Sequence, residues 1–140
     1  FTDFFANFAH DMKKLSTLFV LLAIMTACQE SLEERCEREC VSYTKRHCPL
    51  RVASDVILDS MTFDRTSHTI SYCYTIGGVI DDRQLIERNN PRTQLLQEVK
   101  NSTHLKLYKE AGYSFRYVYY SAKTKGTQLF QATFLEADYN

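Results

Sequence analysis

The chain has 140 residues, and its 17 Lys and Arg residues balance its 17 Asp and Glu residues, so its net charge at pH 7 is zero. Such a chain lacks the basic excess expected of a nucleic-acid-binding protein, and we predict no nucleic-acid partner. With 4 Gly and 2 Pro it is not a low-complexity or linker protein.

The first recognisable element is an export signal over residues 12–27. Lys13 and Lys14 precede an apolar stretch over residues 15–25. This stretch is too short to cross a bilayer core of roughly 30 Å, which takes about 20 helical residues, but it matches the apolar region of a cleaved signal peptide. A buried amphipathic helix would carry polar residues on one face, and residues 18–25 carry none.

The end of this stretch, Met25-Thr26-Ala27-Cys28, resembles the lipobox of bacterial lipoproteins. The resemblance implies diacylglycerol on the Cys28 thiol, cleavage after Ala27 and a lipid anchor in the bacterial cell envelope. Gln29 favours the outer membrane over the inner one, by resemblance to enterobacterial lipoproteins. The alternative is a plain signal peptide that leaves Cys28 as a free thiol.

The predicted domain organisation follows from this signal. Residues 1–11 precede Met12, and we interpret them as upstream sequence translated in error or as a fragment boundary. Residues 28–140 then form a single domain with a short N-terminal tether, long enough to build a core of its own.

The first half of the domain predicts one helix and two strands. Ser31 and Glu34 match a capping box at the start of a helix over residues 31–47, which Cys48-Pro49 ends. Strands are predicted over residues 56–63 and 69–76, because apolar and polar residues alternate there on either side of a polar turn.

The second half predicts helix in pieces over residues 81–111 and then a hairpin. Asp81 or Asp82 can cap the first piece, Pro91 restarts the helix, and Gly112 ends it. Strands over residues 113–120 and 127–135 flank a turn at residues 123–126. The fold class is therefore α+β, in the order helix, strand, strand, helix, strand, strand. We expect a four-stranded antiparallel sheet with the helices packed on one face.

Four stretches resemble a group of small uncharacterised bacterial proteins. They are CPLRVASDVILDSMTFD, ISYCYTI, LLQEVKNS and FRYVYYSAKTKGTQLF, within residues 48–139. The resemblance implies an α+β domain exported to the envelope, and it implies no activity.

The cysteines after residue 28 are candidates for disulfides. Cys36, Cys40, Cys48 and Cys73 are even in number, and an oxidising compartment favours bridges. Pairing of Cys36 with Cys40 within one helix has poor geometry, and pairing of either with Cys73 would fasten the helix to the sheet. A metal site of Cys36, Cys40, His47 and Cys48 matches no common zinc spacing, so we predict neither a metal nor a cofactor.

The functional prediction is a non-enzymatic module that binds an unknown envelope protein or ligand. Tyr117 and Tyr119 are assigned to the core, whereas Arg116 and Tyr120 could form an interaction surface on an uncovered sheet face. One alternative is an exported enzyme that uses Cys48 or Cys73 with a histidine such as His47 or His68. An inhibitor or immunity-type module is another.

Overall fold

The computed structural model describes residues 30–140, and the predicted signal peptide, Cys28 and the upstream segment lie outside this part of the chain. Residues Leu32–Asn140 form a compact unit. Its elements, in chain order, are α2 (Leu32–His47), β1 (Leu50–Ala53), β2 (Val56–Asp64), β3 (Thr69–Ile76), the 3₁₀ turn η1 (Gly78–Ile80), α3 (Arg83–Arg88), α4 (Pro91–Asn101), α5 (Lys106–Glu110), β4 (Ser114–Ser121), β5 (Gln128–Phe134) and α6 (Glu136–Tyr139).

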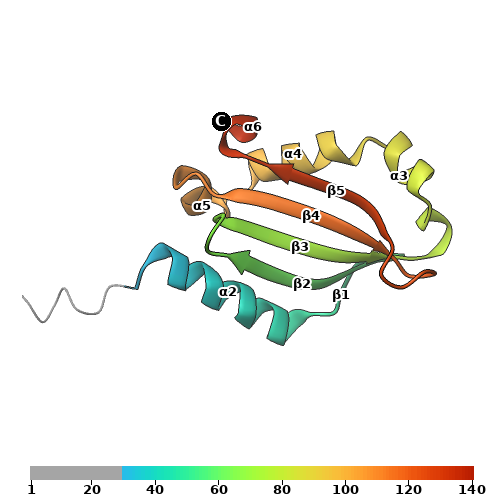
Figure 1. Cartoon of the computed structure of the whole chain (residues 1–140), viewed down its shortest axis with the longest axis horizontal. Coiled ribbons are helices and arrows are strands. Elements are labelled where there is room, and N and C mark those ends of the chain that lie inside the picture. Colours follow the sequence, from blue (N-terminus) through green and yellow to red (C-terminus); the bar gives the residue numbers. More distant parts are fainter. Residues whose placement is uncertain (1–29) are drawn as a thin grey trace, which may run out of the picture. The chain divides into compact units, whose positions relative to one another are not determined.

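The strands form one five-stranded sheet in the order β1-β2-β3-β4-β5 (Figure 1). The sheet is mixed, because β3 and β4 pair in parallel while the other neighbours are antiparallel. The α+β class is confirmed, but the expected four-stranded antiparallel sheet is wrong in both strand number and direction. The segment from β3 to β4 contains α3, α4 and α5, and such a long helical crossover lets the chain return in the same direction.

The unpredicted strand is β1, which pairs with β2 at the edge of the sheet. It has four residues, and all of them are exposed. With four residues it is too short for apolar–polar alternation to be recognised, since that signal is read over about 4–8 residues.

The core lies on the sheet face that carries α2 and α4. Strand register places Ile70 beside Phe115 and Tyr72 beside Tyr117 on that face. Cys36 and Cys40 reach it from α2, and Leu95 and Val99 reach it from α4. The prediction that the helices share one face is therefore confirmed.

Several helix boundaries follow the predicted signals. The Asp82 side chain accepts a hydrogen bond from the Leu85 amide at 3.0 Å and caps α3, while Pro91 is the first residue of α4. Asp81 has another role, since its carboxylate accepts a hydrogen bond from the Lys123 amide at 2.8 Å. Gly112 follows α5 with a φ of +75°, a conformation that glycine adopts without strain.

Between residues 30 and 140, no helix combines the length and the apolar content needed to cross a bilayer.

Candidate functional site

An open groove of about 1020 Å³ lies over the helix-bearing face of the sheet. One wall is α2, and the other is formed by the end of α4, the following loop and α5. In Figure 1 α2 lies beside β2 and α4 beside β5, whereas α5 lies at the end of the sheet where β4 begins. The groove floor is formed by residues of β2, β3 and β4.

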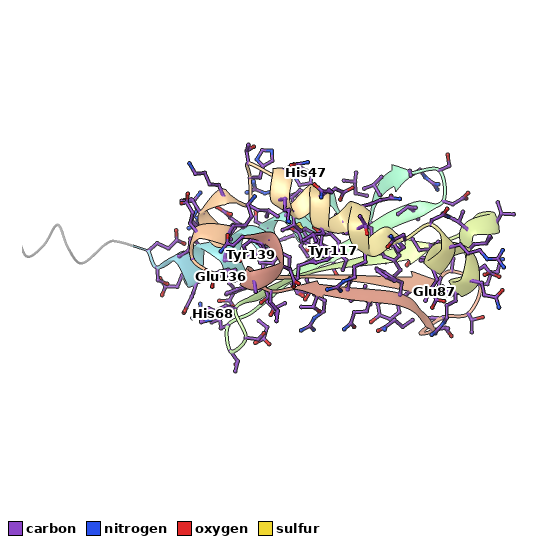
Figure 2. The ribbon with its side chains drawn as sticks, turned by 90° about the horizontal axis from the view of Figure 1, so that it is seen from above. His47, His68, Glu87, Tyr117, Glu136 and Tyr139 are labelled. Atoms are coloured by element: carbon purple, nitrogen blue, oxygen red, sulfur yellow. The ribbon has the colours of Figure 1, made fainter. Side chains whose placement is uncertain are left out.

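The floor is aromatic. Tyr72 and Tyr74 of β3 and Tyr117 of β4 line it, and the rings of Tyr72 and Tyr117 stack with centroids 4.9 Å apart. Figure 2 shows Tyr117 beside α4 in the view from above. Burial raises the pKa of all three phenols, so the floor is uncharged at neutral pH. It offers broad apolar rings together with hydroxyl groups.

The α2 wall is polar and carries basic side chains. Arg38, Ser42 and Arg46 line the groove at intervals of four residues, which is one helical turn. At the end of α2 the His47 ring lies 4.8 Å from the ring of Tyr43. Glu98 lines the opposite wall, so the two walls differ in charge.

A hydrogen bond between the two walls closes part of the groove. The Tyr108 hydroxyl of α5 donates to Glu39 Oε2 of α2 at 2.6 Å, and Arg35 Nε donates to Glu39 Oε1 at 2.7 Å. Burial alone would raise the pKa of Glu39, but the hydrogen bonds from Tyr108 and Arg35 outweigh it and the pKa is lowered. Glu39 is therefore ionised and compensated at neutral pH.

Two of the predicted cysteines lie at the base of this groove. Cys36 and Cys40 line it, and only 1% and 3% of their surfaces are exposed. Their thiols hydrogen-bond to each other, which raises the pKa of Cys36 and lowers that of Cys40. The two buried thiols form a small contact within the core.

The other two cysteines lie elsewhere. Cys73 alternates with Tyr72 and Tyr74 in β3 and so points to the opposite sheet face, and Cys48 is half-buried after α2. The structure has all four as free thiols. A bridge from Cys36 or Cys40 to Cys73 would have to cross the sheet, and disulfide formation stays a prediction.

The two histidines considered as bases have other neighbours in the described residues. His68 Nε2 lies 2.6 Å from Glu33 Oε1, where it connects the β2–β3 turn to α2, while His47 packs on Tyr43 (Figure 2). The use of Cys48 or Cys73 with a histidine stays a prediction. In residues 30–140, no three His, Cys, Asp or Glu side chains are grouped as metal ligands.

The predicted interaction surface lies on the other side of the sheet. Arg116 and Tyr120 alternate with Tyr117 and Tyr119 in β4, so they point away from the groove, and both are half-buried. The buried Arg116 Nε has no hydrogen-bond partner among residues 30–140. The two residues do share a face, as predicted, but the larger concave site is on the opposite face.

No sequence pattern predicted the groove. The assignment of Tyr117 and Tyr119 to the core agrees with the structure, where Tyr117 is buried and the half-buried Tyr119 packs against the core. The available signal was the large number of hydroxyl-bearing aromatics on two adjacent strands. Tyrosine needs a polar or wet environment for its hydroxyl more than phenylalanine does.

Residues 31–130 match the family described as Domain of unknown function (DUF8479). Among curated proteins, none matches the chain.

Two solved structures share the fold. One is a protein from Pseudomonas aeruginosa described as secreted, with a TM-score of 0.62 and 14% identity, covering 80% of this chain and 100% of that one. The other is the pilotin of the type 2 secretion system of Vibrio vulnificus, with a TM-score of 0.61 and 7% identity, covering 78% of this chain and 92% of that one. At these identities the likeness is one of fold.

Proposed function

Since the chain belongs to the family of this domain of unknown function (DUF8479), we propose a function from its groove. The protein is a non-enzymatic component of the bacterial cell envelope, anchored by lipid on Cys28. It binds a segment of another envelope protein between α2 and the α4–α5 wall. The observation that carries this proposal is the groove of about 1020 Å³ with its aromatic floor.

The composition of the groove supports a polypeptide ligand. Tyrosine and arginine are the residue types that most often anchor protein–protein interfaces, and here tyrosines form the floor while arginines line one wall. The groove is open along its top and bounded by helices on both sides. These features suit a segment laid along the groove better than a small molecule, which sites usually enclose on most of its surface.

The setting in the envelope is supported by two independent features. The residues before the domain combine a basic start, an apolar stretch and a cysteine that resembles a lipobox. The fold is shared with a protein described as secreted and with a pilotin of a secretion system. A domain of this kind, held at a membrane surface, would meet its partner in the same compartment.

The anchor is tested by palmitate labelling in a bacterial host. Wild type should incorporate label and yield a mature chain that starts at Cys28, and Cys28→Ala should incorporate none. A labelled Cys28→Ala variant, or a wild-type chain that stays unlabelled, would rule out lipidation at this residue.

The binding site is tested by filling the groove. Ser42→Trp places a large ring in the groove. The control is Val41→Trp, which leaves the groove empty because the neighbouring residue Val41 is 62% exposed and does not line it. Proteins that co-purify with wild type should also co-purify with Val41→Trp and be lost with Ser42→Trp. The purified partner should then bind wild type and Val41→Trp with similar affinity and bind Ser42→Trp much more weakly. Equal binding to both variants would contradict a site in the groove.

A further inference from the structure

We propose that the occupant of the groove is an amphipathic helix that turns an acidic flank toward α2 and a basic residue toward Glu98. This inference rests on the proposed function, and it specifies which segment of a partner fits the site. Helix-in-groove binding is one of the general modes of peptide recognition, and it is distinguished from strand addition by backbone chemistry.

The backbone of the floor excludes an extended ligand. β3 is paired with β2 on one side and with β4 on the other, so its amide and carbonyl groups are already used within the sheet. An extended segment laid on this floor would leave its own backbone groups unpaired against tyrosine rings, which is costly. A helix satisfies its backbone internally and can therefore bury one side there.

The distance between α2 and α4 lets a helix rest on both of them without being fully inserted. α2 packs against β2, and α4 lies over β5, where Arg92 of α4 sits 5.0 Å above the Phe134 ring. β2 and β5 are three strand spacings apart, or about 14 Å at roughly 4.8 Å per strand. The axes of packed helices lie about 8–10 Å apart. The gap between α2 and α4 is wider than one such distance, but it is narrower than the two distances that a helix inserted fully between them needs. Where the Tyr108–Glu39 hydrogen bond joins α5 to α2 the groove is closed, so a third helix would rest on α2 and α4 outside that point, partly above the floor.

The spacing of the tyrosine rings on the floor also matches the spacing of side chains along one side of a helix. Tyr72 and Tyr74 are two residues apart in one strand, which is about 6.6 Å. Side chains at positions i and i+4 of a helix are separated by about 6 Å along its axis. An apolar stripe on the occupant can therefore seat successive side chains against successive rings.

The charges of the walls set the orientation. Arg38 and Arg46 lie along the α2 wall, whereas Glu98 lies on the other. The Glu39 carboxylate, also on the α2 wall, is compensated by Arg35 and Tyr108. His47 and His104 line the groove as well. The occupant therefore gains from acidic side chains on its α2 side and from a basic one opposite.

The test is a selection from an unbiased display library of 16-residue peptides against the full chain, followed by affinity measurements on the enriched peptides. Binders should repeat apolar residues at helical spacing, carry Asp or Glu on one flank and become helical when bound. Arg38→Glu with Arg46→Glu should weaken the enriched peptides roughly tenfold and select basic peptides instead. Lys125→Glu, in the β4–β5 turn away from the groove, should change neither property.

The outcomes separate this inference from the proposed function. We define groove-dependent binders as peptides whose binding is lost with Ser42→Trp. If the apolar residues of these binders alternate with a period of two, or if the binders are rich in proline, the helical occupant is ruled out while the groove remains the binding site. Helical binders indifferent to the Arg38 and Arg46 reversal would overturn the acidic flank. If no binder is lost with Ser42→Trp, then the groove itself is not the site and both proposals fail.

Discussion

Removal of the Tyr108 hydroxyl should destabilise the domain, because this group joins the two walls of the groove. In Tyr108→Phe the 2.6 Å hydrogen bond to Glu39 Oε2 is lost, and Tyr108 itself is only 7% exposed. A hydrogen bond to a charged group contributes about 1.5–3 kcal/mol when the partner is left without solvent. The Glu39 side chain is 45% exposed and keeps Arg35, so we expect a smaller loss of about 1–1.5 kcal/mol.

Urea unfolding measures this change directly. At the slope typical of small domains, such a loss lowers the midpoint by about 0.5–1 M urea. Tyr43→Phe is the matched control, since it removes a hydroxyl from the same groove without removing a hydrogen bond among residues 30–140. A change below about 0.3 kcal/mol for Tyr108→Phe, or an equal change for Tyr43→Phe, would refute the reasoning.

The pH dependence of this loss has a definite sign. The folded pKa of Glu39 lies below its ordinary value of 4.5, so its stabilising effect is present above that value and disappears as the pH falls through the folded pKa. The difference between wild type and Tyr108→Phe should therefore be constant near neutral pH and shrink in acid. The same difference should shrink at pH 7 in a Glu39→Gln background.

Three further predictions concern other parts of the fold. Burial raises the pKa of Tyr119 to about 12 and raises those of Tyr72, Tyr74 and Tyr117, so stability present below pH 10 should be lost as the pH rises through these folded values. Phenolate absorbance should then rise together with loss of circular dichroism, and a full rise in a still-folded chain would contradict this. Asp82→Ala should cost about 1 kcal/mol and speed hydrogen exchange at the Leu85 amide, since the cap of α3 is lost. Any unpaired thiols at Cys48 and Cys73 should react with Ellman's reagent before those at Cys36 and Cys40, because Cys36 and Cys40 are only 1% and 3% exposed. The reverse order of reaction would show that the base of the groove is open to the reagent.

The elements of the fold could be read from local signals in the sequence. Alternation in β2, β3 and β4, proline at the start of α4 and glycine after α5 each fix a local conformation. These signals depend on neighbours in the chain, and they survive in the structure because the core agrees with them. The agreement extends to the shared face of α2 and α4.

What local signals could not supply is how strands pair across the chain. The sequence between β3 and β4 shows a helical crossover, but the direction in which β4 returns depends on the packing of those helices. β1 was not predicted because a strand of four residues is too short to give a recognisable alternation.

The groove is a property of the assembled layers. Tyr72 and Tyr117 are far apart in the chain and become neighbours through the parallel pairing of β3 with β4. α2 and α4 pack toward different strands, so the two rings line the groove between them, with Tyr117 buried and Tyr72 half-buried. Neither feature is present in any single segment, and the sequence pattern instead predicted an interaction surface at Arg116 and Tyr120.

Site-specific photo-crosslinking in living cells tests the central claim most directly. A photoreactive residue is placed at Ser42 or Ser102 in the two groove walls, at Val41 on the exposed side of α2, or at Tyr120 on the opposite sheet face. The groove account predicts that positions 42 and 102 crosslink to the same short segment of one envelope protein, and that positions 41 and 120 do not. Crosslinking of that protein from position 120, with none from 42 and 102, would contradict the account and move the binding site to the face of Arg116.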